Sequence, residues 1–145
     1  MASWLIYTII SIIVILVLIV IFYKMRHAKT GVWVRHAGGG YVNGLTPEES
    51  VAYCKSNNAK LSTLSDLNIL NDGVFNYCQT SWYLKPDGSY GNMWLSNGIN
   101  PNDCGPKGVN VYPDSHILTL NNKLGTFCTG VIPTTPEVGA SKLFK

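Results

Sequence analysis

The chain begins with one long apolar run and continues with short apolar runs separated by polar positions. After a short segment at 1–3, residues 4–23 carry no charged side chain, and Ile and Val dominate them. Twenty residues of α-helix rise about 30 Å, the thickness of the hydrocarbon layer of a bilayer. Lipid cannot bond to backbone amides, so only a helix or a closed barrel is viable there. The run therefore predicts a transmembrane helix at 4–23.

The flanks of this run favour a retained anchor over a cleaved signal peptide. Trp4, Tyr7 and Tyr23 lie near its ends, as interfacial aromatic residues do. A signal peptide has a positive n-region, an apolar core of about 7 to 15 residues and a small-x-small cleavage site. This segment has none of the three. The sequence therefore predicts a single-pass membrane protein.

A basic juxtamembrane segment, residues 24–30, follows the apolar run and contains Lys24, Arg26 and Lys29. From His36 onward the chain has 7 basic and 8 acidic residues, so the net charge of +3 belongs to the region beside the membrane. A nucleic-acid-binding face would need basic residues clustered in the folded part. We therefore expect the bilayer, and no nucleic acid, as a partner.

Two helices are predicted early in the folded part. Thr46 suits the N-cap, Pro47 the first helical position and Glu49 the reciprocal capping-box position, so a helix should run to about residue 55. A second helix should start after Thr63, with Asp66 three residues on, and stop at Gly73. The apolar positions of this second helix are Leu64, Leu67 and Leu70.

Beyond Phe75 the pattern changes to short β-type runs with turn signals between them. The turn signals are Asp87-Gly88, Asn97-Gly98 and Pro101-Asn102. The apolar and aromatic positions are Trp82, Tyr83, Tyr90, Trp94, Val109, Val111, Tyr112, Ile117 and Leu118. Such runs predict a small antiparallel sheet. Pro133 and Pro136 then begin a segment, 131–145, that we expect to be an extended C-terminal tail. The fold class is therefore α+β.

Four cysteines, at positions 54, 78, 104 and 128, are separated by 24, 26 and 24 residues. None of these intervals is short enough for a CxxC zinc or redox motif. Two structural disulfides are the natural interpretation, and the spacing leaves three possible pairings. A thiol-exchange enzyme is a remote alternative.

The charges and the cysteines give opposite signals about the side of the membrane on which the domain lies. Lys24, Arg26 and Lys29 follow the apolar helix, so the positive-inside rule puts the C-terminal domain in the cytosol. Four cysteines in a small domain indicate an oxidising compartment. The domain is therefore expected either at the cell surface or facing outward from a virion membrane. A large DNA virus with its own thiol oxidase would reconcile both signals.

The folded part, 31–130, carries an ordered series of residues that resembles a known family, the Link module. The series is Gly31-Val32-Trp33, Gly40-Tyr41, Leu45-Thr46 through Glu49, Ala52, Cys54, Ala59-Lys60-Leu61-Ser62-Thr63, Leu67, Phe75, Cys78, Trp82-Tyr83-Leu84, Asp87-Gly88, Tyr90, Cys104-Gly105, Gly108-Val109, Tyr112 and Cys128. Link modules are C-type-lectin-like domains found in hyaluronan-binding matrix proteins and receptors. The resemblance implies two helices packed on antiparallel strands. It also implies the disulfides Cys54–Cys128 and Cys78–Cys104.

The same resemblance implies a ligand groove. Tyr41, Tyr90 and Tyr112 fall where the family has groove aromatics, and Lys107 is the one nearby cation that could hold a uronate carboxylate. The family's other basic positions are largely missing. Gly40 stands where a Lys or Arg often precedes the tyrosine, Pro106 follows Cys104-Gly105, and Gly91-Asn92 follow Tyr90. The alternative is that these tyrosines are ordinary sheet and core residues.

The sequence gives little support to an enzyme, a metal site or a bound cofactor. His27, His36 and His116 are far from one another in sequence, and Glu48 and Glu49 suit the first turn of a helix. We therefore expect a non-enzymatic, membrane-anchored binding or adhesion protein that engages a hyaluronan-like polysaccharide or a protein partner. The alternative is a structural membrane protein of a large DNA virus particle, in which the Link-like domain is an adaptor to neighbouring virion proteins.

Overall fold

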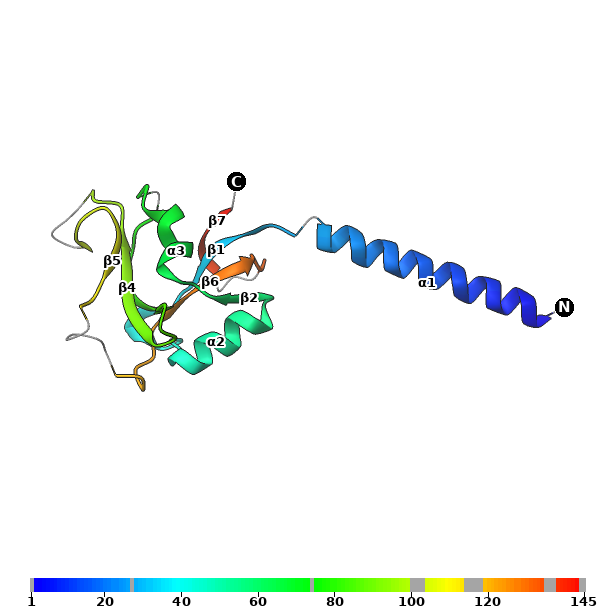
Figure 1. Cartoon of the computed structure of the whole chain (residues 1–145), viewed down its shortest axis with the longest axis horizontal. Coiled ribbons are helices and arrows are strands. Elements are labelled where there is room, and N and C mark those ends of the chain that lie inside the picture. The colour runs from blue at the N-terminus through cyan, green and yellow to red at the C-terminus, as the bar shows by residue number, and fades with distance from the viewer. Residues whose placement is uncertain are drawn as a thin grey trace.

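The computed structural model describes residues 2–26, 28–73, 75–99, 104–113, 119–134 and 138–143. An N-terminal apolar helix precedes an α+β domain with a mixed seven-stranded sheet, helices and two disulfides (Figure 1). The elements are α1 (Ala2–Arg26), β1 (Thr30–Arg35), η1 (Gly39–Tyr41), α2 (Pro47–Ser56), β2 (Ala59–Leu61), α3 (Leu64–Leu67), η2 (Asn68–Leu70), β3 (Tyr77–Leu84), β4 (Tyr90–Ser96), β5 (Gly108–Val111), β6 (Gly125–Val131) and β7 (Val138–Leu143).

Helix α1 contains the apolar run. Its segment Trp4–Tyr23 has a mean hydropathy of 3.3 and none of it is buried against the rest of the chain. Figure 1 shows the helix extending away from the domain. A helix of this length and composition serves as a signal sequence or as a membrane anchor.

Both predicted helix starts are confirmed by their caps. At α2, Glu49 N–H donates to Thr46 Oγ1 (3.3 Å) and Thr46 N–H donates to Glu49 Oε2 (2.9 Å), which closes the capping box. Thr63 and Asp66 form the same arrangement at α3. The second helix is shorter than predicted, because α3 has one turn and continues as the 3₁₀ turn η2. Its apolar residues recur every three positions, which suits a 3₁₀ turn.

The sheet has the strand order β5-β4-β3-β6-β1-β7, and β2 also pairs with β6. The prediction of an antiparallel sheet is wrong for one pair: β3 and β6 are parallel, with Ser81 opposite Gly125 and Trp82 opposite Thr126. Parallel neighbours need a long crossover connection, here supplied by β4, β5 and the loop before β6. Residues 101, 102, 117 and 118, which the prediction also used, lie outside the described residues.

The C-terminal segment adds a strand to the sheet beyond the domain limit of 130 expected from the sequence. Within the expected tail, β7 pairs antiparallel with β1. This pairing needs a glycine at position 31, because a Cβ there would lie 2.0 Å from the carbonyl oxygen of Lys142. The Lys142 ammonium also contacts the Asp72 carboxylate and the Ile69 carbonyl oxygen, which ties β7 to the turn after η2.

Both faces of the sheet are buried, so side chains that alternate along one strand contribute to two core clusters. The first cluster packs with α3 and η2 and contains Val32, Val34, Leu67, Leu70, Tyr77, Tyr83, Met93, Leu95 and Phe127. The second cluster packs with α2 and contains Trp33, Cys54, Leu61, Trp82, Leu124 and Cys128. The two clusters fix which residues of each strand face α2.

The disulfides are Cys54–Cys128 and Cys78–Cys104, as the resemblance to Link modules implies. Cys54–Cys128 joins α2 to β6, and both residues are 0% exposed. Cys78–Cys104 joins β3 to the chain before β5, with Cys104 buried and Cys78 exposed.

Candidate functional site

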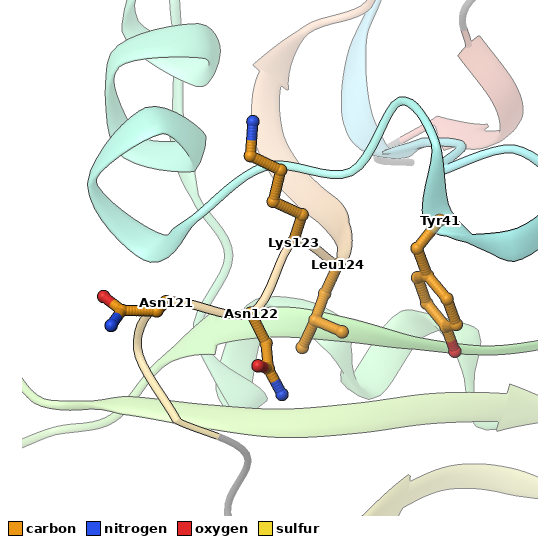
Figure 2. A pocket seen from close by; sticks show the side chains of 5 residues that line it. All are labelled: Tyr41, Asn121, Asn122, Lys123 and Leu124. Carbon is orange, nitrogen blue, oxygen red and sulfur yellow. The ribbon is translucent and has the colours of Figure 1, made fainter.

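A shallow hollow of 370 Å³ lies where the loop before α2 meets the chain that leads into β6. Its lining residues are Tyr41, Asn121, Asn122, Lys123 and Leu124 (Figure 2). Two backbone hydrogen bonds of 2.9 Å between Leu45 and Leu124 join these segments. Gly44 makes the close approach possible, because a Cβ there would lie 2.5 Å from the backbone of Lys123. The hollow is therefore built on fixed backbone.

Tyr41 forms one wall of the hollow and has a left-handed backbone conformation, with φ of 59°. This conformation costs a non-glycine residue about 1 to 3 kcal/mol and is concentrated at functional sites. Thr80 N–H of β3 donates a 3.1 Å hydrogen bond to the Tyr41 hydroxyl, and the ring packs against the second core cluster. These contacts offset the cost and fix a half-buried ring in the wall.

The opposite side of the hollow presents hydrogen-bonding groups and a cation. Asn121 and Asn122 lie in a turn held by a 2.9 Å bond from Asn122 N–H to the Thr119 carbonyl oxygen. Each side-chain amide supplies two donors and one acceptor oxygen. Lys123 is exposed, and Figure 2 shows its side chain extending away from the Tyr41 ring. None of the five lining residues is acidic.

Tyr90 and Tyr112 lie on the same part of the sheet but outside this hollow. Tyr90 begins β4 and packs, as Tyr41 does, against the second core cluster. Tyr112 N–H donates to the Asn92 carbonyl oxygen (3.0 Å), and the Tyr112 ring lies 4.7 Å from the Trp94 ring. Tyr90 and Trp94 are four residues apart on one strand and therefore face the same side.

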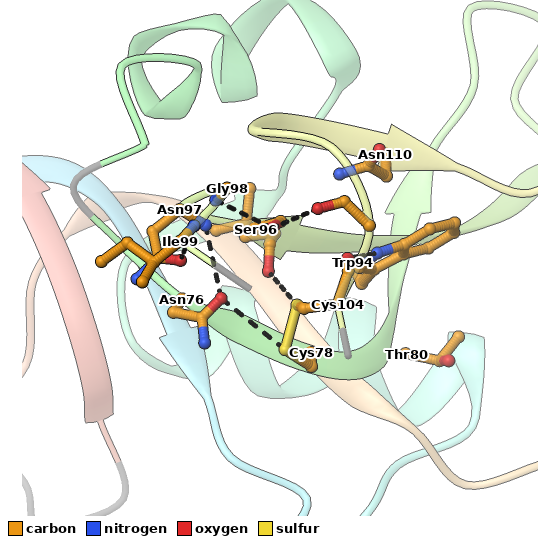
Figure 3. The surroundings of a disulfide bond; sticks show 12 residues. Asn76, Cys78, Thr80, Trp94, Ser96, Asn97, Gly98, Ile99, Cys104 and Asn110 are labelled. Carbon is orange, nitrogen blue, oxygen red and sulfur yellow. Dashed lines mark hydrogen bonds between the residues drawn. A yellow bond between two sulfur atoms is a disulfide. The ribbon is translucent and has the colours of Figure 1, made fainter. Parts of the chain in front are cut away.

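Trp94 has a fixed orientation beside the exposed disulfide. Its indole N–H donates to the Cys104 carbonyl oxygen (2.7 Å), and the Ser96 hydroxyl donates to the Gly105 carbonyl oxygen (2.8 Å). Figure 3 shows both bonds around Cys78–Cys104. The disulfide therefore also holds the aromatic pair Trp94 and Tyr112.

Lys107 lies apart from the three tyrosines. Its side chain covers Gly73 and Gly98, where an added Cβ would lie 2.4 Å and 2.7 Å from Lys107 atoms. Lys107 and Tyr112 flank opposite ends of β5, and five residues of strand span about 17 Å. The lysine that lines the hollow together with Tyr41 is instead Lys123, whose side chain extends away from the Tyr41 ring. Sequence reasoning missed it, together with Asn121 and Asn122, since only the Leu45–Leu124 pairing brings them to Tyr41.

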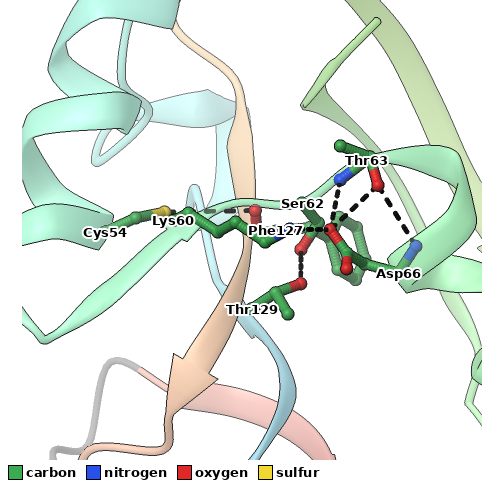
Figure 4. A network of polar contacts seen from close by, with 7 residues as sticks. All are labelled: Cys54, Lys60, Ser62, Thr63, Asp66, Phe127 and Thr129. Atoms are coloured by element: carbon green, nitrogen blue, oxygen red, sulfur yellow. Dashed lines mark hydrogen bonds and ion pairs between the residues drawn. The ribbon is translucent and has the colours of Figure 1, made fainter. Parts of the chain in front are cut away.

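A polar network between β2 and α3 perturbs the acidity of Asp66 (Figure 4). Burial raises the pKa of this carboxyl, but hydrogen bonds from Thr63 and Lys60 outweigh burial and hold the pKa below its ordinary 3.8. The Asp66 oxygen lies 2.9 Å from Thr63 N, 2.9 Å from Thr63 Oγ1 and 3.0 Å from Lys60 Nζ. The network caps a helix and ties it to β2.

The other perturbed groups also have local structural causes. Burial raises the pKa of the Tyr77 phenol, which lies in the first core cluster. The Ser89 hydroxyl and backbone N–H lower the pKa of the exposed Asp87 carboxyl in the β3–β4 turn. The described residues include no group of three His, Cys, Asp or Glu side chains that could hold a metal ion. His36 packs against Tyr77, and His27 and His116 lie outside the described residues.

Comparisons of the chain with protein-family models and with curated proteins found no match.

Proposed function

We propose that this chain is a membrane-anchored, non-enzymatic recognition protein whose Link-like domain binds a polysaccharide through the hollow beside Tyr41. The observation that carries the proposal is the left-handed Tyr41, held half-exposed in the wall of the hollow by Thr80. Keeping an aromatic residue in this conformation costs free energy that glycine or asparagine would avoid. The ring therefore has a use at this position.

The chemistry of the lining supports a sugar ligand. An aromatic ring offers a flat apolar surface on which the apolar face of a sugar ring can stack. The amides of Asn121 and Asn122 can donate to and accept from sugar hydroxyl groups. Lys123, on the rim, can pair with a uronate carboxylate. The absence of acidic residues from the five lining positions suits a polyanion such as hyaluronan.

The position of the hollow supports recognition of a ligand outside the bilayer. After α1 the chain enters the domain at Thr30, the first residue of β1, which pairs with Val131. Val131 N–H bonds to the Asn58 carbonyl oxygen, just beyond the C-terminal end of α2. The two segments that form the hollow, the loop before α2 and the chain that leads into β6, lie at the N-terminal end of α2 (Figure 1). With α1 retained as an anchor, the domain presents the hollow away from the lipid.

Binding of the full chain in lipid nanodiscs to immobilised hyaluronan tests the proposal. Tyr41→Gly removes the ring but keeps the left-handed backbone, so we expect at least a tenfold loss of affinity, about 1.4 kcal/mol. Lys107→Ala is the matched control and should bind as wild type. No retention of the wild-type protein at low salt would refute glycosaminoglycan binding.

A protein adaptor in a virion membrane is the second candidate, and two observations favour it. Val42, next to Tyr41, is 80% exposed, and an exposed valine suits a protein surface better than a sugar. Basic residues and disulfides also lie on the same side of α1. Protease protection of isolated membranes, combined with non-reducing electrophoresis, tests this candidate. An oxidised domain exposed to the cytosol supports it, and a lumenal domain excludes it.

A further inference from the structure

The connection between α1 and the sheet is too short to hold the domain away from a membrane. Helix α1 ends at Arg26 and β1 begins at Thr30, so four Cα steps separate them, at most about 14 Å. Ile132 N–H donates to the Lys29 carbonyl oxygen (2.9 Å), which already binds Lys29 to the sheet. A domain of this size has a radius of gyration of about 13 Å. One end of the domain must therefore lie at the headgroup layer.

The pairing of the strands identifies the residues at that end. Thr30 pairs with Val131, and Val131 N–H bonds to the Asn58 carbonyl oxygen. Asn58 N–H bonds in turn to the Lys55 carbonyl oxygen. Gly31 pairs with Leu143 on the other side of β1. We call this surface the proximal end and define it as Lys29, Lys55, Asn58, Ile132 and Leu143.

The proximal end combines cations with an exposed apolar side chain. Lys29 and Lys55 are exposed, and neither has an ion-pair partner within the described part of the chain. Leu143 is 50% exposed. The carboxylates of Asp66 and Asp72, on neighbouring elements, are each bound by another lysine. Lys24 and Arg26 add positive charge in the sequence just before this surface.

We infer that the proximal end binds the anionic lipid headgroups of the bilayer that α1 spans. Positive charge beside a membrane is attracted to anionic lipid over a distance of about one Debye length, roughly 8 Å at physiological salt. The short connection holds Lys29, three residues after the end of α1, close to the headgroups, and the hydrogen bonds through Asn58 place Lys55 at the same end of the domain. The surface rests on the anchor part of the proposed function and is independent of the ligand in the hollow.

Lysine acylation tests the surface. The full chain is reconstituted in nanodiscs of phosphatidylcholine, with and without phosphatidylglycerol, an anionic lipid that has no amine, then treated with an amine-reactive reagent and read by peptide mass spectrometry. Lys29 and Lys55 should react several-fold more slowly when phosphatidylglycerol is present, and high salt should restore their rates. The acylation rates of Lys107 and Lys123 should not depend on the anionic lipid. Equal responses at all four lysines would overturn the inference.

A pair of charge reversals sharpens the test. Lys55→Glu should abolish most of the lipid-dependent protection of Lys29, whereas Lys123→Glu, an exposed lysine beside the hollow, should leave it unchanged. Both variants change an exposed side chain, so neither should alter folding, which circular dichroism checks. Unchanged protection of Lys29 in Lys55→Glu would refute a shared lipid surface.

The mass of the recovered protein distinguishes a failure of this inference from a failure of the membrane-anchor proposal. Loss of residues 1–26 from the mature protein would refute the anchor. An intact chain in which Lys29 and Lys55 show no lipid-dependent protection would refute the proximal surface alone.

Discussion

The two disulfides hold two regions of the sheet in different ways. Cys54–Cys128 is buried, spans 74 residues and joins α2 to the centre of the sheet. Cys78–Cys104 spans 26 residues, has an exposed cysteine and holds the loop beneath the Trp94–Tyr112 pair. The central region around β6 is thus held from inside the core, whereas the second disulfide fixes the edge of the sheet at β4 and β5, beside the half-buried Trp94 and Tyr112. The difference teaches that one type of bond can stabilise the core at one place and position half-buried aromatic side chains at another.

The largest expected effect on the free energy of unfolding comes from removing the disulfides one at a time, which tests the difference between the two regions directly. The loop-entropy model gives about 4.4 kcal/mol for the longer loop and about 3.5 kcal/mol for the shorter one. The variant Cys54→Ala/Cys128→Ala also removes buried contacts, so it should lose at least about 4 kcal/mol of unfolding free energy. Cys78→Ala/Cys104→Ala should lose less and should retain the near-ultraviolet signal of the core. Urea unfolding measures both, and a larger loss from the second pair would contradict the assignment.

Gly44→Ala should damage the hollow from within the central region. The new Cβ would lie 2.5 Å from the Lys123 backbone, so the Leu45–Leu124 pairing must shift, at a cost of about 1 to 3 kcal/mol. We expect lower stability in urea together with weaker ligand binding. Gly39→Ala is the matched control, because nothing lies within 4 Å of an added Cβ there. Equal effects of the two substitutions would show that the close approach does not form the hollow.

The cap of α2 should contribute a smaller amount. Thr46→Ala removes the side-chain acceptor for Glu49 N–H and should lower the unfolding free energy by about 1 kcal/mol. Thr46→Ser keeps the oxygen and should restore most of that loss. Chemical denaturation compares the three proteins, and a full loss in Thr46→Ser would rule out the capping bond as the cause.

The smallest expected effect is a difference between Asp66 and Asp87 in how acid changes the free energy of unfolding. The pKa of Asp66 is lower in the folded protein than its ordinary 3.8, so its contribution is present above that value and is lost as pH falls through the folded pKa. Asp66→Asn should therefore remove part of the acid sensitivity of folding, less than about 1 kcal/mol. Asp87→Asn is the exposed control and should change the pH profile little. Unfolding followed between pH 2 and pH 7, about the range of carboxyl titration, measures both.

The sequence predicts those parts of the fold that depend on local chemistry. Thr46 with Glu49, and Thr63 with Asp66, give the starts of both helices because capping acts over three residues. The disulfide pairing came from the resemblance to Link modules, since spacing allows three. Strand β7 and the parallel β3–β6 pair were missed because both depend on contacts between distant segments.

In the candidate site too, the residues that depend on contacts between distant segments could not be predicted from the sequence. Tyr41 was predicted as a groove residue and does line the hollow, whereas Lys107 lies elsewhere. Asn121 and Lys123 carry no local signal that would distinguish them from ordinary turn residues. They reach Tyr41 because Leu45 and Leu124 pair, and no periodicity in the sequence predicts that pairing. Their role could be found only from the folded arrangement.

Strand β1 also determines how the protein would resist a pulling force. It follows α1 directly and is paired on both sides, with β6 and with β7. Antiparallel hydrogen bonds are perpendicular to the strands. A ligand that pulled on the hollow against a membrane-embedded α1 would draw β1 along its own length. Bonds on both edges would then be loaded together in shear, and the strand could not be unzipped one bond at a time. The order of elements therefore suits a tether that must hold under tension.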